Sequence, residues 1–298
     1  MTHPWTLMLC CARPGRWVTL LVAGLLVALP AAAQDGRDAP PVGTATATVG
    51  KTQRPAGPSL AGEFGLLRAT FVHTISSPRN WDEGAWTAFP SWVGGMAGIS
   101  LMDEWARELA DRPLPDAAHA VLDFVEPLGM EASFGVLGGF YAAGLVLDDR
   151  RARSVALEGL AASALAGGII TPVLQRVVGR KRPRHSPDTH DFEPFSGNMG
   201  FPSGHVTQAF AVASVIATEY DSAWVDATAY GLAGGVALHR LVNDAHHLSD
   251  VTAGALIGTL VGRSVARFGQ EYRRVVRVRP FSEAGLEDGT AVGLSVVF

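Results

Sequence analysis

The stretch Phe201–Gln208, FPSGHVTQ, places a proline, a serine, a glycine and a histidine directly before a helix-like segment of small residues. Gly204 permits close approach of the backbone to a ligand, and Ser203 can cap the helix that follows. Free N–H groups at a helix start bind anions, and His205 lies in the first turn beside them. The stretch therefore predicts a phosphate cradle with an acid next to it. A plain N-cap with a surface histidine is the alternative.

Outward from this stretch, the chain is a series of segments rich in Ala, Gly, Leu and Val that are longer than strands and show no sustained alternation. Their length and small-residue content favour helices. With 298 residues, of which 48% are hydrophobic, the chain can form one domain with one core. The sequence therefore predicts an all-α protein built as a helical bundle. The expected helices span about 84–102, 118–128, 132–147, 155–178, 205–219, 224–240 and 248–267.

The start of the chain differs from this helical region. Residues 1–33 are typical of a secretory signal peptide, with two arginines before an apolar stretch and AAAQ as the cleavage site; an uncleaved membrane anchor is the alternative. Both cysteines, Cys10 and Cys11, lie in this segment, so cleavage would leave neither a disulfide nor a Cys metal site in the mature chain. Residues 34–61 are rich in Pro, Gly, Thr and Ala and are expected to form a flexible linker.

The helical domain is expected over 62–270, and a tail follows over 271–298. Within the tail, VVRVRPF (275–281) and AVGLSVVF (291–298) predict a short C-terminal β-hairpin, because apolar residues alternate in the second segment. The last strand of an outer-membrane barrel has a similar pattern, but one strand cannot close a barrel.

The relation of the chain to a membrane allows two interpretations. A span needs roughly 20 apolar residues, and most uncharged runs here are shorter, which is typical of buried core helices. Arginines, however, gather at 150–153 and 273–279, and the positive-inside rule would place both clusters in the cytoplasm, with 180–205 and 240–250 facing outward. We therefore expect an exported protein. It is either embedded in the inner membrane with its site facing the periplasm, or a soluble or peripheral periplasmic bundle.

A basic segment lies upstream of the opening stretch. RVVGRKRPR (Arg176–Arg184) has five cations in nine residues. Arginine offers a planar fork of donors for phosphate oxygens, and Pro183 ends a helix and fixes the direction of the chain after Arg182. The functional interpretation is a phosphate clamp, and a solvated basic loop is the alternative.

A third segment, HRLVNDAHHLSDVTAG, carries three histidines. His246 and Asp250 are four residues apart and would share a helix face, so the carboxylate can hold one ring nitrogen and leave the other as a nucleophile. Arg240 lies six residues before His246. The other histidines, His239 and His247, have no such partner in the sequence and are interpreted as non-functional. Zinc is not expected, because no H-E-x-x-H or Cys spacing supports it.

Together the three segments resemble the signature of the type 2 phosphatidic acid phosphatase superfamily, which also holds bacterial class A acid phosphatases and vanadium haloperoxidases. That signature is Lys, six residues, Arg-Pro; then Pro-Ser-Gly-His; then Ser-Arg, five residues, His, three residues, Asp. Here it reads QRVVGRKRP, PSGH and HRLVNDAHHLSD, within about residues 130–267. Two positions depart from it. Gln175 stands where the family has Lys, which removes one phosphate-binding charge, and His239 stands where it has Ser.

The resemblance implies a helical bundle of the acid phosphatase/haloperoxidase type. It also implies a metal-independent phosphatase, without a cofactor, that hydrolyses a phosphomonoester or diphosphate. The expected substrate is a phosphorylated lipid. His246 would attack phosphorus to form a phosphohistidine, Asp250 would orient it, and His205 would protonate the leaving group and then activate water. The phosphate-binding residues would be Arg182, Ser203, Gly204, Arg240 and, in place of the family's Lys, Gln175.

Two other functions stay open. The same cradle can hold vanadate, as in a vanadate-dependent haloperoxidase, although the missing Lys weakens this interpretation. A non-catalytic phosphate-binding relative is the other alternative. The partners expected are a phosphorylated lipid or another phosphate ester and a membrane. The formal net charge of −4 argues against a nucleic acid. The sequence leaves the ester itself undetermined.

Overall fold

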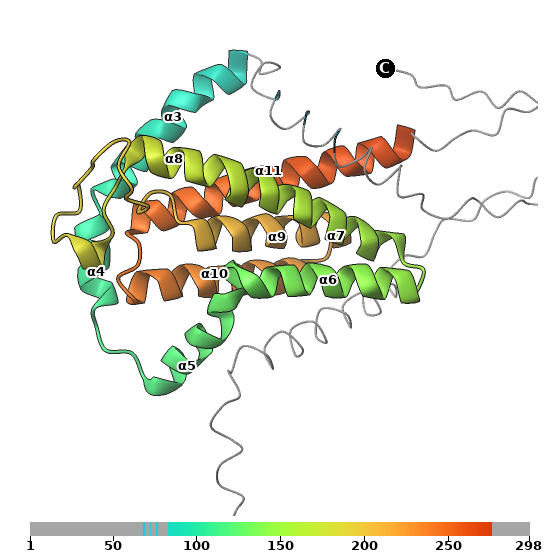
Figure 1. Ribbon diagram of the computed structural model, residues 1–298, viewed down its shortest axis with the longest axis horizontal. Coiled ribbons are helices and arrows are strands. Elements are labelled where there is room, and N and C mark those ends of the chain that lie inside the picture. The colour runs from blue at the N-terminus through green and yellow to red at the C-terminus, as the bar shows by residue number, and fades with distance from the viewer. Residues whose placement is uncertain (1–67, 69–71, 73–75, 77–82, 276–298) are drawn as a thin grey trace, which may run out of the picture.

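The computed structural model describes residues 68, 72, 76 and 83–275 (Figure 1). In this part of the chain the ordered elements are helices and no strand occurs, although one isolated bridge pairs Arg180 with Phe192. The predicted all-α class is therefore confirmed. The elements are α3 (Glu83–Ser100), α4 (Asp103–Ala110), α5 (Asp116–Val125), η2 (Glu126–Gly129), α6 (Glu131–Val146), α7 (Arg150–Ala162), η3 (Ser163–Ile170), α8 (Thr171–Val178), η4 (Pro183–His185), α9 (Gly204–Tyr220), α10 (Ala223–Val242) and α11 (Leu248–Val275).

The helices that were predicted from apolar segments occur close to their expected positions, but α4 was missed. Its sequence, DEWARELA, carries four charged residues, so it is not an apolar segment of the kind used to predict helices. The long helix predicted over 155–178 begins earlier, at Arg150, because Asp149 caps it by accepting hydrogen bonds from the backbone N–H groups of Arg151 and Ala152. This helix continues through the π-helical turns of η3 into α8.

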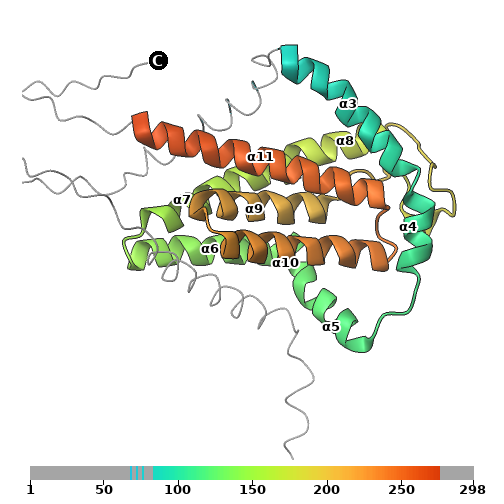
Figure 2. The ribbon, with the colours of Figure 1, turned by 180° about the vertical axis from the view of Figure 1, so that it is seen from behind.

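Helix α9 occupies the centre of the bundle, with α7, α10 and α11 packed around it (Figures 1 and 2). It contributes to both apolar cores. Ala209, Val212 and Ile216 pack with residues of α6, α7 and α10, whereas Ala211 and Val215 pack with residues of α7, η3 and α11. Burial of these side chains from water on two sides fixes the position of α9, whose first residue belongs to the PSGH segment.

Three glycines let α11 lie directly against α9. A Cβ on Gly254 would lie 2.7 Å from the carbonyl oxygen of Ser203, and one on Gly258 would lie 2.4 Å from that of Thr207. Gly262 meets α9 in the same way, 2.5 Å from the carbonyl oxygen of Ala211. Any larger side chain would separate the two helices. The close packing therefore brings the start of α11 beside the start of α9.

The three motif segments meet at one end of the bundle. The loop after α8, the start of α9 and the connection between α10 and α11 all lie there, and α4 lies at the same end in both views (Figures 1 and 2). The loop after α8 leaves the helix at Gly179, which has a φ of 59°. A Cβ at this position would lie 1.8 Å from the carbonyl oxygen of Glu193, so only glycine fits.

Several sequence predictions lie outside the described residues. These are the signal peptide, the linker and almost all of the C-terminal hairpin, of which only Val275 is described, as the last residue of α11. The domain boundaries stay predictions. Among the described residues one helical stretch, Arg150–Val178, is long and apolar enough to cross a bilayer, and 44% of its apolar window is buried inside the protein. Core helices of soluble proteins can have the same length and composition, so both membrane interpretations stand.

Candidate active site

The basic segment after α8 contains two arginines with different surroundings. Arg180 is 1% exposed, and its guanidinium donates to Asp103 Oδ2 at 2.7 Å and to Asp250 Oδ1 at 2.6 Å. Arg182 is half-buried, and burial lowers the pKa of its guanidinium, with a smaller contribution from the positive charges of Arg184 and Arg240. Arg180 is thus neutralised by carboxylates, whereas Arg182 lies among other cations, which favours an anion beside it.

Gln175, at the position of the family's Lys, is buried near the start of α9. Its side-chain Nε2 donates to the carbonyl oxygen of Pro202 at 3.0 Å, and a Cβ on Gly204 would lie 3.9 Å from that nitrogen. The structure therefore places Gln175 against the PSGH segment, as the resemblance implies. Its amide holds the backbone of this segment.

Ser203 precedes α9, but its hydroxyl does not cap the helix as predicted. The residue is fully buried, its side chain makes no capping hydrogen bond, and Oγ has no partner among the described residues. Its backbone N–H donates to the carbonyl oxygen of Asp250 at 3.0 Å, which ties the start of α9 to the start of α11. A buried hydroxyl without a partner is costly, so Ser203 Oγ is available to a ligand.

His205, in the first turn of α9, faces a carboxylate that the motifs do not contain. Its Nε2 lies 3.3 Å from Glu126 Oε1, and the same oxygen accepts a hydrogen bond of 2.6 Å from Arg240 Nη2. Burial lowers the pKa of His205 to about 4, and the charges of Arg240, His246 and Arg182 act in the same direction. These contributions show that both arginines and both histidines lie close together.

His239 contacts a carboxylate that lies far from it in the sequence. Its Nε2 lies 3.1 Å from Asp123 Oδ1, and its Nδ1 lies 2.9 Å from Arg240 Nη2. Because Arg240 can only donate, Nδ1 accepts this bond and Nε2 carries the proton that is directed to Asp123. The histidine that replaces the family's Ser therefore connects α5 to Arg240.

His246 is 3% exposed and lies in the connection before α11, so it shares no helix face with Asp250. Its Nδ1 lies 2.7 Å from the carbonyl oxygen of Gly200 and 3.8 Å from Asp250 Oδ2. A carbonyl only accepts, so Nδ1 donates and the lone pair remains on Nε2. Gly200 makes the shorter contact with His246, and Asp250 also pairs with Arg180, so the orienting role of Asp250 stays a prediction.

The structure brings the sequence-predicted residues to one place and adds residues that the motifs did not indicate. Glu126 and Asp103 lie on η2 and α4, far from the motifs in sequence, and no spacing rule could have found them. Arg180 and Gly200 lie beside motif residues, but their roles depend on contacts across the bundle. Within the described part of the chain no group of three or more His, Cys, Asp or Glu side chains is placed to hold a metal ion. The absence of a metal from the reaction stays a prediction.

Comparison with known proteins supports the resemblance. The family model described as "PAP2 superfamily" matches residues 156–274, a range that holds all three motif segments. This segment is a PAP2 superfamily sequence. It includes α8 to α11 and therefore every residue proposed for the site, whereas α4, α5 and η2 lie outside it.

Curated relatives match over shorter ranges. A lipid A 1-phosphatase of Porphyromonas gingivalis is 42% identical over 64 residues, which is 21% of this chain and 14% of that protein. A lipid A 1-phosphatase of Rhizobium etli is 33% identical over 99 residues, which is 30% of this chain and 40% of that protein. The chain therefore spans well under half of the length of either relative.

A solved structure also matches. The crystal structure of a transmembrane PAP2-type phosphatidylglycerolphosphate phosphatase from Bacillus subtilis aligns over 74% of this chain and 98% of its own, with a TM-score of 0.42 and 17% sequence identity.

Proposed function

We propose that the protein is a metal-independent phosphatase that removes phosphate from a lipid by way of a phosphohistidine on His246. The observation that carries the proposal is the meeting of the three motif segments at the start of α9, where the Ser203 N–H donates to the Asp250 carbonyl and His205 and Arg240 share Glu126. Burial lowers the pKa of the Arg182 and Arg240 guanidiniums, so a bound anion would stabilise their charged forms. A phosphate is the anion that the motifs predict here.

The nucleophile is Nε2 of His246. Because Nδ1 donates to Gly200, Nε2 keeps its lone pair and can attack phosphorus. A bond forms between Nε2 and phosphorus while the bond between phosphorus and the lipid oxygen breaks. His205 gives its proton to that oxygen, which leaves as an alcohol. Since burial and nearby positive charges lower the pKa of His205 to about 4, the negative charge of the bound phosphate must raise this pKa before His205 can act as the acid.

Water completes the reaction. The neutral His205 takes a proton from a water molecule, whose oxygen attacks phosphorus and displaces Nε2 of His246. Inorganic phosphate then leaves, and both histidines return to their initial states. In both steps the charge on the equatorial oxygens is stabilised by Arg182, Arg240, the hydroxyl of Ser203 and the backbone N–H of Gly204. The buried Oγ of Ser203, which has no hydrogen-bond partner among the described residues, supports this role.

The proposed substrate is a lipid phosphate monoester, and lipid A 1-phosphate is the first to test, because the curated relatives carry that activity in their names. The stretch Arg150–Val178 is long and apolar enough to cross a bilayer, which is compatible with association with a membrane. We propose that the protein is exported and that the site faces the periplasm, at or in the inner membrane.

The test is release of phosphate by the purified full chain in detergent micelles. The panel holds lipid A 1-phosphate, phosphatidylglycerophosphate, undecaprenyl diphosphate and the soluble ester p-nitrophenyl phosphate, each with and without EDTA. We expect hydrolysis of a lipid ester that EDTA does not change. Loss of all activity in EDTA would contradict the metal-free mechanism.

The nucleophile is tested by trapping. Brief reaction with a ³²P-labelled substrate and alkaline quenching should leave acid-labile label on the wild-type protein and none on His246→Ala. His185→Ala is the matched control, because His185 is exposed in the loop after α8, and it should be labelled like the wild type. Label that persists on His246→Ala would overturn the assignment.

A further inference from the structure

We propose that Asp103, on α4 and outside the segment that matches the PAP2 family, is a positioning residue for the reaction. The inference rests on the proposed function, because it concerns how the structure holds His246 and the phosphate cradle. It assigns a role to α4, which neither the motifs nor the family match includes.

Asp103 is fully buried and all of its known partners belong to the site end of the bundle. Its Oδ1 accepts the backbone N–H of Ser249 at 2.8 Å, and its Oδ2 accepts the Ser249 hydroxyl at 2.6 Å and Arg180 Nη2 at 2.7 Å. Ser249 is the second residue of α11, where a backbone N–H has no partner within the helix. Asp103 therefore caps α11 from another helix, and its charge also favours the helix N-terminus.

Arg180 carries the connection further. While Nη2 binds Asp103, Nη1 donates to Asp250 Oδ1 at 2.6 Å and to Ser249 Oγ at 2.7 Å. Asp250 Oδ2 accepts the backbone N–H of His247 at 2.8 Å, and the Asp250 carbonyl accepts the N–H of Ser203. One chain of buried hydrogen bonds thus runs from α4 to the residue after the proposed nucleophile and to the start of the cradle.

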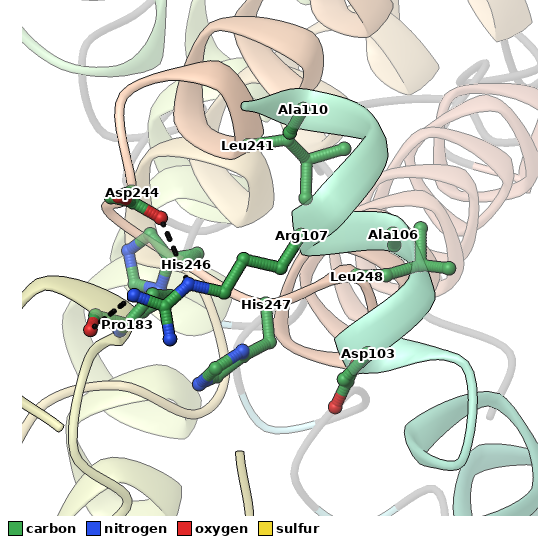
Figure 3. A pocket seen from close by; sticks show the side chains of 10 residues that line it. All are labelled: Asp103, Ala106, Arg107, Ala110, Pro183, Leu241, Asp244, His246, His247 and Leu248. Carbon is green, nitrogen blue, oxygen red and sulfur yellow. Dashed lines mark hydrogen bonds and ion pairs between the residues drawn. The ribbon is translucent and has the colours of Figure 1, made fainter. Parts of the chain in front are cut away.

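A second inward residue of α4 holds the same loops. Arg107, one turn after Asp103, donates from Nη2 to the carbonyl oxygen of Pro183 at 3.2 Å, and its Nε lies 3.5 Å from Asp244 Oδ1 (Figure 3). Pro183 follows Arg182, and Asp244 lies two residues before His246. In Figure 3, Asp103, Arg107 and His246 line one pocket. Helix α4 therefore contacts the loops on both sides of the site.

The charges of the network make its geometry sensitive to Asp103. Two carboxylates, Asp103 and Asp250, share the guanidinium of Arg180, and all three side chains are at most 1% exposed. A partly satisfied buried network is costly and rearranges. If Asp103 loses its charge, Arg180 has only Asp250 as an anionic partner in this network. We expect the Ser249–Asp250 turn, and with it His246, to shift.

The test compares Asp103→Asn with Glu104→Gln in the full chain. Glu104 is the exposed neighbour of Asp103 on α4 and serves as the matched control. With the ester that the wild type hydrolyses fastest, we expect Asp103→Asn to lower kcat by about 10- to 100-fold, because small displacements of reacting groups have effects of this size. We expect KM to change less than twofold, because Arg182 and Arg240 remain. The control should match the wild type in both constants.

A second readout separates positioning from loss of the fold. Inorganic phosphate, added to the detergent-solubilised protein, should raise the Tm of the wild type and of Asp103→Asn by similar amounts, because the cradle is intact in both. The variant Ser249→Ala removes only the hydroxyl between Asp103 and Arg180. We expect this variant to fold and its kcat to be several-fold lower than that of the wild type. If Asp103→Asn does not fold and Ser249→Ala keeps the kcat of the wild type, Asp103 is structural only and the proposal fails.

The proposal and the proposed function fail in different arms of the experiment. Unchanged kcat in a folded Asp103→Asn would overturn the positioning role and leave the phosphatase assignment intact. Equal activity of wild type and His246→Ala would overturn the mechanism on which the positioning role depends, and the proposal would fall with it. A rise in KM with kcat unchanged would show that Asp103 acts on substrate binding, which also contradicts the proposal.

Discussion

Arg180 and Arg182 are two residues apart in one loop, yet they belong to two regions of opposite character. Arg180 lies in a saturated region, where Asp103, Asp250, Ser249 and the carbonyl of Thr189 accept its hydrogen bonds. Arg182 lies in an open region with Arg240 and His205, where Glu126 contacts Arg240 and His205 but no carboxylate pairs with Arg182 among the described residues. Equal charge in the sequence therefore corresponds to different surroundings in the structure.

The difference between the two arginines shows that a buried cation is available to a ligand only where carboxylates of the protein have not already neutralised it. A guanidinium with two carboxylate partners gains little from phosphate and holds the fold together. A guanidinium that is desolvated beside other cations gains much from an anion. Variants of the saturated region should therefore change stability, and turnover only through the position of His246. Variants of the open region should change turnover directly.

The largest effect is expected for Arg180→Ala in the saturated region. The change leaves Asp103 and Asp250 buried without a counter-charge, which should lower the free energy of unfolding by about 3–5 kcal/mol. Arg184→Ala, in the same loop but exposed, should change it by less than about 0.5 kcal/mol. Thermal or denaturant unfolding measures both. A Tm of Arg180→Ala equal to that of Arg184→Ala would remove the distinction between the regions.

The open region is tested by Arg182→Ala and Arg240→Ala. Each change removes a donor to the transition-state charge and should lower kcat/KM by about 100- to 1,000-fold. The Tm of Arg182→Ala should stay close to that of the wild type, because no carboxylate pairs with Arg182 in the described residues. Arg176→Ala, exposed on α8, is the control for loss of a cation. A large fall in Tm with little change in turnover would place Arg182 in the saturated region.

The pH dependence of stability offers a test of the saturated region, because His247 is buried there. It is 3% exposed, neither ring nitrogen has a hydrogen-bond partner among the described residues, and burial lowers its pKa from 6.5 to about 4. Between these values the unfolded chain binds the proton and the folded protein does not, so stability falls as the pH falls from 6.5 towards 4. The charged groups near it are Arg180, Asp250, Asp103 and Arg107.

His247→Gln should therefore lose less stability than the wild type on acidification. At pH 5 the difference between the two proteins, relative to pH 7.5, should reach roughly 2 kcal/mol. Unfolding curves at the two pH values measure it, with the exposed His185→Gln as the control. An equal loss of stability in wild type and His247→Gln would show that His247 takes up its proton in the folded protein.

The smallest effect is expected for Gln175→Lys, which restores the family's cation. Gln175 already bonds to Pro202 with its amide, and Arg180 cannot supply the missing charge because it is paired. A new charge-assisted bond to phosphate should raise kcat/KM by less than tenfold, which is at most about 1.4 kcal/mol. Gln175→Glu is the control and should lower it. Loss of activity in Gln175→Lys would show that the site requires the neutral amide.

The helices of the bundle could be predicted from the sequence because each apolar segment is long and rich in small residues. The segment from His205 onward is an example, since its apolar residues fill both cores. Helix α4 could not be predicted in this way. It buries Asp103 and exposes Trp105 and Leu109, which is the reverse of the pattern expected for a surface helix. A buried carboxylate is stable there only because Arg180 and Ser249 surround it.

The sequence by itself determined which residues lie together at the start of α9, because the helix start, its glycine and the histidine beside them are neighbours in the chain. It also determined the spacing of His246 and Asp250. Only the tertiary structure decided their partners. His246 bonds to Gly200 rather than to Asp250, and Asp250 bonds to Arg180. The physical reason is that a hydrogen bond or ion pair depends on distance in space, and the close packing of α11 on α9 sets those distances.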